Sequence, residues 1–253
     1  MAIEKRAGKV RLDTLLVERG ICQSRERARA LILCGSVIVK GEPVTKAGAL
    51  FPPEVDIEVR GSDNPYVSRG GLKLKTALEA FRIDAAGMVG IDVGASTGGF
   101  TDCLLQSGAA RVYAVDVGYG QLAWKIRQDP RVVSIERTNI RFYNGSGIEE
   151  PVDIAVVDAS FISLKLVIPA VLRLVPEGAI ILALIKPQFE AGRGEVGKKG
   201  VVRDPSVHAR VVADIRAFFE SQPLEVRGTI ESPILGSEGN REFFICAVKK
   251  KGT

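Results

Sequence analysis

Two charged residues come directly after apolar runs and are of the types that can move a proton. Asp158 ends the run Ile154–Asp158, and Lys186 ends the run Ile180–Lys186. Because the carboxyl ends of parallel strands meet at one edge of a sheet, we expect both side chains at the same rim. A lysine that follows a buried strand is costly unless it is paired, and Asp158 would supply the partner. The pair is either a structural ion pair or a base held for proton transfer.

Two further charged residues are candidates for the same site. Transfer of a group to a sugar hydroxyl needs a base, because the hydroxyl is a poor nucleophile. A lysine can serve as that base when burial and a second cation lower its pKa. Lys73, on a helix expected from Ser68 to about Phe81, is a candidate for the second cation, and Glu242, which opens the last strand, could position a lysine. By residue type alone, each is more often a surface residue.

A glycine-rich segment, residues 92–100, has the composition of a ligand-binding turn. It follows the apolar strand Val89–Val93 and precedes a helix, the position at which open parallel sheets bind ligands. Its spacing differs from the dinucleotide pattern G-x-G-x-x-G, and a merely structural turn is the alternative. Asp92 either binds an ammonium group of the ligand or orients the loop. The candidates for cofactor binding in this segment are Asp92, Gly94, Ala95, Ser96, Thr97, Gly98, Gly99 and Phe100.

Asp116 is a candidate partner for a ribose. It ends the strand Arg111–Asp116, where a carboxylate can accept hydrogen bonds from both ribose hydroxyls. Enzymes that use NAD place an acidic residue in the same way, so Asp116 does not choose between NAD and S-adenosylmethionine. It is also compatible with a helix cap or an exposed strand end. The expected cofactor set is completed by Val117, Asn139 and Asp158.

Repeated strand–helix units must position these residues from Met88 onward. They predict an α/β fold with a Rossmann-like, mostly parallel sheet covered by helices on both faces. Seven strands are expected, at Val89–Val93, Arg111–Asp116, Val132–Glu136, Ile154–Asp158, Ile180–Lys186, Glu225–Glu231 and Glu242–Lys249. Helices are expected at Phe100–Gln106, Ala123–Gln128, Leu164–Leu174 and from Asp204-Pro205 to about Phe219.

Residues 1–60 are predicted to form a small α+β domain of their own. Leucines on one helical face predict a first helix, Ser24 can cap a second, and a strand, a turn and another strand follow at Val37–Val44. Residues 61–67, rich in Gly, Ser, Asp, Asn and Pro, are expected to be a linker. Residues 68–253 would then be the second domain.

Positive charge is concentrated near the start of the chain. The whole chain has a net charge of +5, and residues 1–46 alone carry an excess of the same size. Either this is a solvated basic surface, or it meets an anionic partner such as RNA, whose phosphates arginine and lysine can contact. The glycine-rich stretch 190–200 is expected to be a basic lip that orders on RNA, or else a mobile surface loop. The RNA-binding candidates are Arg11, Arg25, Arg27, Arg29, Lys40, Lys46, Arg69, Lys198 and Lys199.

Cysteine and histidine usage does not indicate a metal site. The four cysteines form no Cys-x-x-Cys pair, and the one histidine, His208, is expected to be solvated on a helix. The longest apolar run, Ala179–Ile185, is far shorter than the roughly 20 residues of a membrane helix. We see no secretion signal, and we expect a cytoplasmic protein without a metal. A monomer is compatible with the sequence, which leaves the oligomeric state open.

Several segments, in order along nearly the whole chain, resemble the TlyA family of bacterial ribosomal RNA methyltransferases, historically labelled haemolysin A. Residues 11–60 resemble the S4-type RNA-binding domain that opens these proteins, and the remainder resembles the FtsJ-like (RrmJ-type) methyltransferase domain. One departure is Gly71-Leu72, where the family pattern leads us to expect a small residue followed by a polar one. The matching segments are Val67–Leu74, Asp92–Asp102, Ala114–Trp124, Glu136–Asn139, Asp158–Leu164, Lys186–Glu190 and Gly239–Phe244.

The resemblance implies a specific reaction. Members of the family methylate the 2′-hydroxyl of cytidine in ribosomal RNA, with S-adenosylmethionine as cofactor and S-adenosylhomocysteine as product. They use a Lys-Asp-Lys-Glu tetrad, which by motif corresponds to Lys73, Asp158, Lys186 and Glu242. Ribosomal RNA or a ribosomal subunit is then the expected partner. The rival hypotheses are a non-catalytic rRNA-binding assembly factor, a haemolysin as the historical label suggests, and a nicotinamide-dependent reductase.

Overall fold

The computed structural model describes residues 8–22, 24–33, 35–59, 64–192, 194–197, 200–236 and 238–252. Its contacts divide the chain into two compact units, Met1–Asp63 and Asn64–Thr253, and each unit is described by itself. Cys34, Lys198 and Lys199 lie outside the described residues.

Within its described residues, the first unit contains two helices and several short strands. The described elements are β1 (Val10–Arg11), α1 (Leu12–Glu18), α2 (Arg25–Leu33), β2 (Val37–Val39), β3 (Glu42–Pro43), β4 (Leu50–Phe51) and β5 (Ile57–Val59). Strand β2 pairs antiparallel with both β3 and β5, while β1 pairs with β4. The side chain of Ser24 accepts a hydrogen bond from the backbone N–H of Arg27 at 3.2 Å and so caps α2, as its residue type predicts. The core holds Leu12, Leu15, Leu16, Ala28, Ile32 and the strand valines.

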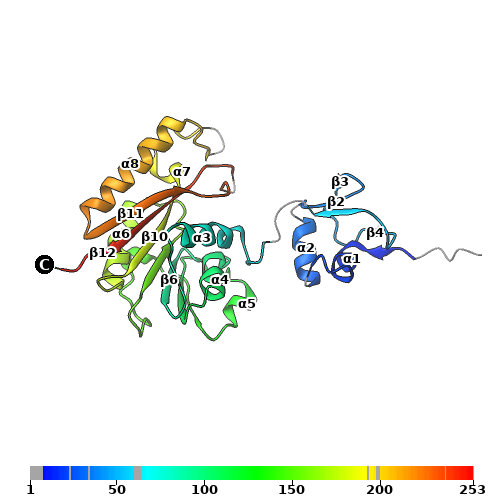
Figure 1. Ribbon diagram of the computed structural model, residues 1–253, viewed down its shortest axis with the longest axis horizontal. Helices are drawn as coiled ribbons and strands as arrows, with labels where there is room; N and C mark the ends of the chain where they lie inside the picture. The colour runs from blue at the N-terminus through cyan, green and yellow to red at the C-terminus, as the bar shows by residue number, and fades with distance from the viewer. Residues whose placement is uncertain are drawn as a thin grey trace, which may run out of the picture. The chain divides into compact units, whose positions relative to one another are not determined.

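The second unit contains the predicted α/β sheet (Figure 1). Its strands are β6 (Val89–Val93), β7 (Arg111–Val115), β8 (Val132–Ile135), β9 (Ile154–Val157), β10 (Ile180–Ile185), β11 (Leu224–Glu231) and β12 (Phe243–Lys249). They lie in the order β11-β12-β10-β9-β6-β7-β8. Neighbours from β10 to β8 are parallel, whereas β12 runs antiparallel to both β10 and β11. The predicted mostly parallel, seven-stranded sheet is therefore confirmed.

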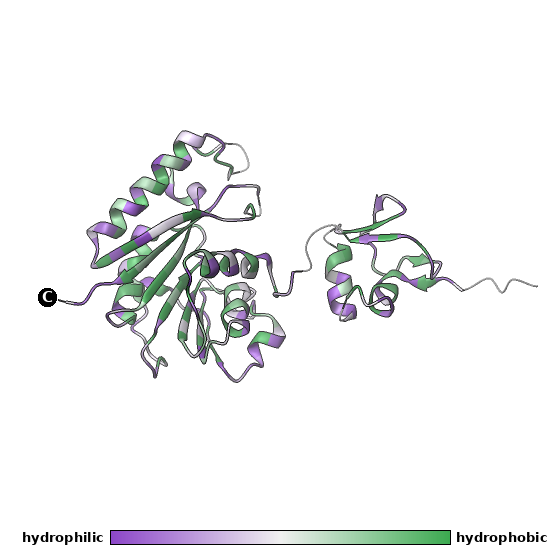
Figure 2. Cartoon of the chain, viewed as in Figure 1, coloured by the Kyte–Doolittle hydropathy of each residue, from purple (hydrophilic) through white to green (hydrophobic). Residues whose placement is uncertain are grey.

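Helices cover both faces of this sheet. They are α3 (Arg69–Ala80), α4 (Gly99–Gln106), α5 (Trp124–Arg127), the 3₁₀ helix η1 (Ile140–Phe142), α6 (Leu164–Leu174), α7 (Pro187–Glu190) and α8 (Pro205–Ser221). Successive strand residues alternate between two cores, because strand side chains point to opposite faces. Tyr113 and Val115 belong to the core with α6 and α8, whereas Val112 and Ala114 belong to the core with α3, α4 and α5. The central strands are correspondingly hydrophobic along their length (Figure 2).

Two local predictions need correction or addition. His208 was expected to be solvated, but it is only 4% exposed. Its Nε2 lies 3.0 Å from the carbonyl oxygen of Val202. The residue is buried because it lies on the face of α8 that packs against the sheet. Sequence patterns also did not indicate the β1–β4 pair or η1, which are too short to show periodicity. In the described residues, no helix is long and apolar enough to span a bilayer.

Candidate active site

The site lies where the strand order reverses. From β6 the chain continues to β7 and β8 on one side, and β9 then pairs with β6 on the other side. Ligands of open α/β sheets bind beyond the carboxyl ends of the strands at such a point. The glycine-rich loop follows β6 here, and Asp158 follows β9, so the topology brings the two together.

Asp92, near the end of β6, holds the end of the glycine-rich loop through hydrogen bonds to Thr101. It is fully buried, and its Oδ2 accepts hydrogen bonds from the backbone N–H of Thr101 at 2.9 Å and from the Thr101 hydroxyl at 2.7 Å. Burial raises the pKa of Asp92 to about 7. Asp92 does not line either cavity described below, so in this structure it orients the loop and the start of α4.

Glycine is required where the loop passes β9. Gly94 has φ of 86°, and a Cβ there would lie 2.7 Å from the backbone oxygen of Asp158. At the start of α4, a Cβ on Gly99 would overlap Ser68 Oγ, the group that caps α3. The glycines thus let α3, the loop and β9 approach one another closely.

A cavity of about 490 Å³ opens on the β7 side of the loop, a size suited to a small cofactor. Its walls combine apolar side chains with the carboxylates of Asp116 and Asp158 and the amide of Asn139. Asp116 accepts the backbone N–H groups of Ser96 and Gly118, both at 2.7 Å, one on each carboxylate oxygen. The full lining is Val93, Gly94, Ser96, Val115, Asp116, Val117, Gln121, Thr138, Asn139, Ile140, Asp158, Ala159, Ser160, Phe161, Ile162 and Val167.

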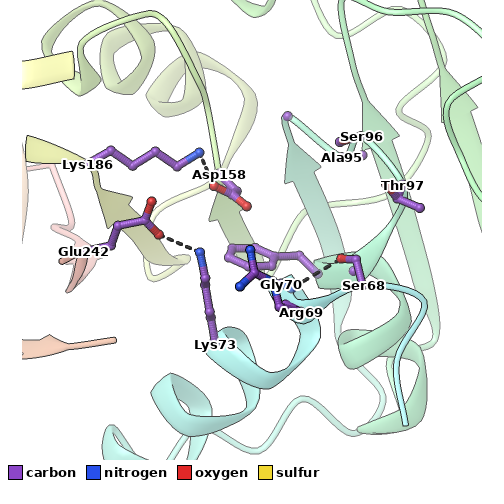
Figure 3. A pocket seen from close by; sticks show the side chains of 13 residues that line it. Ser68, Arg69, Gly70, Lys73, Ala95, Ser96, Thr97, Asp158, Lys186 and Glu242 are labelled. Atoms are coloured by element: carbon purple, nitrogen blue, oxygen red, sulfur yellow. Dashed lines mark hydrogen bonds and ion pairs between the residues drawn. The ribbon is translucent and has the colours of Figure 1, made fainter. Parts of the chain in front are cut away.

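A second cavity, of about 230 Å³, lies on the α3 side of the loop and holds two ion pairs (Figure 3). Lys73 Nζ lies 2.6 Å from Glu242 Oε2, and Lys186 Nζ lies 2.7 Å from Asp158 Oδ1. The loop residues Gly94, Ala95, Ser96, Thr97, Gly99 and Phe100, together with Arg69, also line this cavity. Asp158, Gly94 and Ser96 belong to both linings, so the two cavities adjoin.

The direction of β12 explains how Glu242 reaches this rim. Because β12 is antiparallel to β10, its first residue, Phe243, pairs with the last residue of β10, Ile185. Glu242 and Lys186 are the neighbours of that pair, and both are buried. The four residues proposed as a tetrad are therefore brought together from α3 and from the ends of β9, β10 and β12.

Sequence reasoning missed three side chains here. Ser160 Oγ accepts a hydrogen bond from Lys186 Nζ at 2.8 Å, and Gln188 Nε2 lies 3.5 Å from Glu242 Oε1. Phe161, which is 90% exposed, lies 5.0 Å from Phe189 between ring centroids. The available signal was proximity in sequence, because each of these residues is within three positions of Asp158 or Lys186.

The described RNA-binding candidates lie in three different surroundings. Arg69 lines the cavity of the ion pairs. In the first unit, Lys40 and Lys46 are exposed and Arg27 is half-buried. Three others, Arg11, Arg25 and Arg29, surround the carboxylate of Asp13, a residue that the sequence did not single out. Among the described residues, no group of three His, Cys, Asp or Glu side chains could hold a metal ion.

Comparisons with known proteins agree with this architecture. Residues 66–249 match the FtsJ-like methyltransferase model, and residues 10–57 match the S4 domain model. The chain is 47% identical over 240 residues to the 16S/23S rRNA (cytidine-2′-O)-methyltransferase TlyA of Mycobacterium tuberculosis, covering 94% of this chain and 90% of that one. It is 41% identical to Hemolysin A of Brachyspira hyodysenteriae, covering 92% of this chain and 98% of that one.

Solved structures share the fold of this chain over most of its length. A Streptococcus thermophilus protein named as a hemolysin superposes with a TM-score of 0.76 at 42% identity, covering 97% of this chain and 90% of that one. An O-methyltransferase from Bacillus cereus in complex with SAH superposes with a TM-score of 0.50 at 17% identity, covering 72% of this chain and 82% of that one, which bears on the fold alone.

Proposed function

This chain belongs to the FtsJ-like methyltransferase family, and from that premise we propose that it transfers a methyl group from S-adenosylmethionine to the ribose 2′-hydroxyl of cytidine in ribosomal RNA. The observation that carries the proposal is two ion pairs, the buried Lys73–Glu242 and the partly buried Lys186–Asp158, in a cavity that shares residues with the cofactor cavity. A methyl donor in one cavity and a hydroxyl in the other would meet at Asp158 and the glycine loop.

The residues of the larger cavity fit the proposed cofactor. Asp116 has a free lone pair on each carboxylate oxygen beyond its two backbone contacts, which suits the two hydroxyls of a ribose. Val117, Ile140 and Ile162 offer apolar surface for a base, and Asn139 lines the same wall. When bound, S-adenosylmethionine supplies a methyl group activated by its sulfonium.

Lys186 is the group placed to act on the hydroxyl. Asp158 and Ser160 hold its ammonium nitrogen from two sides, at 2.7 and 2.8 Å. In the proposed step, an uncharged Lys186 Nζ would take the proton of the 2′-hydroxyl and so become the ammonium that Asp158 and Ser160 hold, and the hydroxyl oxygen would receive the methyl group that S-adenosylmethionine supplies, with S-adenosylhomocysteine as the product. Lys73, fixed by Glu242, lies across the same cavity and provides positive charge beside the developing oxyanion.

Alignment and proton transfer would share the rate enhancement. Positioning of oxygen, carbon and sulfur in line is the larger contribution, and a base adds roughly 10²–10⁴-fold. The first unit, which matches the S4 domain, would deliver the RNA through contacts to phosphates. We place the reaction in the cytoplasm, where ribosomal RNA is found.

Replacement of Lys186 tests the proposal. We expect Lys186→Ala to lower the incorporation of tritiated methyl groups into ribosomal RNA by roughly 10²–10⁴-fold, the usual contribution of a positioned base. Calorimetry should show unchanged affinity for S-adenosylmethionine. Lys75→Ala is the matched control, because Lys75 is half-exposed and pairs only with Glu79 on the surface of α3 among its described partners. Normal turnover by Lys186→Ala would exclude the assigned role, and no methyl incorporation by the unmodified protein would exclude the function.

A further inference from the structure

A buried carboxylate in the first unit lies at the centre of three arginines. Asp13, in the first turn of α1, has no exposed surface. Its Oδ1 accepts from Arg11 Nε at 2.9 Å, and its Oδ2 accepts from Arg11 Nη2 at 2.8 Å. The same Oδ2 also accepts from Arg25 Nη2 and from Arg29 Nε, both at 3.2 Å. One carboxylate thus contacts three guanidinium groups, one from β1 and two from α2.

The local sequence explains this convergence. Arg25 and Arg29 are four residues apart on α2, so they lie on the same face of that helix. Ser24 fixes the start of α2, and Arg11 comes directly before α1. The arginines contact Asp13 through guanidinium nitrogens, while their side chains stay 44%, 49% and 52% exposed. Contact with Arg11 above all holds the pKa of Asp13 well below its usual range, so the carboxylate is ionised at neutral pH.

The cluster has the properties of a preformed anion site. Three guanidinium groups against one carboxylate leave an excess of two positive charges in one place. Each guanidinium has five N–H donors, and the contacts to Asp13 use only one or two of them, so donors remain on every arginine for a second acceptor. Phosphate oxygens are suited to such a fork of donors. Holding the arginines before RNA arrives lowers the entropic cost of ordering them on binding.

We propose that Asp13 is a positioning residue, which holds Arg11, Arg25 and Arg29 as a phosphate-binding cluster for the RNA backbone. The inference rests on the proposed function only in taking RNA as the partner. It differs from a general attraction between a basic surface and RNA, because Asp13 is itself negative. In a purely electrostatic view its charge weakens RNA binding, whereas as a positioning residue it strengthens binding.

Asp13→Asn separates the two views by the sign of its effect. The variant removes a negative charge close to the phosphates, so charge alone predicts tighter binding to RNA. The proposal predicts binding weaker by about tenfold, the size of one charge-assisted hydrogen bond, because asparagine cannot hold three guanidinium groups. Binding of the full chain to transcribed 16S ribosomal RNA is measured by filter binding between about 50 and 200 mM salt. Asp56→Asn, the same change at an exposed position of the first unit, is the matched control and should bind as tightly as the unmodified chain or more tightly.

Further measurements exclude a loss of folding. If Asp13→Asn folds, its thermal unfolding and its affinity for S-adenosylmethionine should equal those of the unmodified chain. Its KM for RNA should rise, while kcat at saturating RNA stays the same. If Asp13→Asn does not fold, Arg25→Lys/Arg29→Lys keeps the charge but lacks the forked donors, and it should also bind RNA about tenfold more weakly. Arg19→Lys, outside the cluster, should not.

The outcomes distinguish this inference from the proposed function. Equal or tighter RNA binding by folded Asp13→Asn would overturn the positioning role and leave methyl transfer untouched, as would unchanged binding by the lysine variant. Normal RNA binding without methyl transfer by the unmodified chain would overturn the proposed function alone. Failure of the unmodified chain to bind RNA would overturn both.

Discussion

Lys73 Nζ lies 2.6 Å from Glu242 Oε2, although the two residues are 169 positions apart in the sequence. Both side chains are almost fully buried, at 10% and 3% exposure, so each charge depends on the other for compensation. The pair joins the start of the methyltransferase unit to its last strand. A change at either end should therefore affect both the stability and the chemistry of the site.

Glu242→Gln should separate these effects. We expect the free energy of unfolding to fall by about 3 kcal/mol, because the Lys73 ammonium would stay buried without its counter-charge. Urea unfolding followed by far-ultraviolet circular dichroism measures this change. The double variant Lys73→Met/Glu242→Leu should recover the stability without recovering methyl transfer. A single variant as stable as the unmodified chain would contradict the importance of the pair.

Gly236→Ala should disturb Glu242 without altering any charged residue. A Cβ at Gly236 would overlap Glu242 Oε1, so the carboxylate must move away from Lys73. We expect methyl transfer to fall by about tenfold or more, since displacement of a positioned group by a fraction of an ångström is costly. Gly252→Ala is the control, because among the described residues only the end of the Glu177 side chain, which is not part of the site, lies within 4 Å of its added methyl group. Equal rates for the two variants would show that the Glu242 carboxylate adapts freely.

Ser160→Ala removes one of the two groups that hold Lys186 Nζ. The expected result is a rate of methyl transfer lower by about tenfold in a single turnover, the value of one hydrogen bond to a charged group. Ser160→Thr retains the hydroxyl and should restore most of the rate. Calorimetry must accompany both, because Ser160 also lines the cofactor cavity. An alanine variant with full rate and normal cofactor affinity would mean that Asp158 alone positions the lysine.

The buried Asp92 predicts a pH dependence of stability. Its pKa is about 7 in the folded chain against 3.8 when unfolded, because burial disfavours the charged form. Between these values the folded state keeps a proton that the unfolded state has released. The free energy of unfolding therefore falls as pH rises from about 4 to about 7, by at most roughly 1.4 kcal/mol per pH unit from this group.

Asp92→Asn should remove that fall, because asparagine does not titrate and its side-chain oxygen can still accept both hydrogen bonds from Thr101. The quantity to compare is the difference in urea stability between variant and unmodified chain, in the absence of cofactor, at pH 4 and pH 7.5. The difference should be small at the lower pH and should favour the variant at the higher pH. A pH-independent difference would indicate that Asp92 is ionised throughout.

The fold was predictable because its signals are local and repeated. Apolar strands alternate with helices, and the order of the motifs matched a known family, so the sheet and its rim followed from the sequence. The glycine loop and Asp158 could be placed at that rim because each comes directly after a strand. The catalytic roles stay predictions, since the geometry shows proximity and not turnover.

Other features depend on contacts that no local pattern reveals. The partner of Lys73 is set by the antiparallel pairing of β12 with β10, which a sequence of strands does not specify. The burial of Asp13 depends on how α2 packs against α1, and by residue type this aspartate resembles an exposed first-turn acid. The same is true of His208, whose burial follows from tertiary packing and not from its own helix pattern.

The antiparallel direction of β12 also has a consequence for the order of events during synthesis. The ribosome makes Lys73, Asp158 and Lys186 well before this strand. It makes Glu242 directly before the first residue of β12, Phe243. Until β12 has left the ribosome and inserted between β10 and β11, Lys73 has no counter-charge and the cavity lacks one wall. Insertion of one strand thus acts as the assembly step that completes the site.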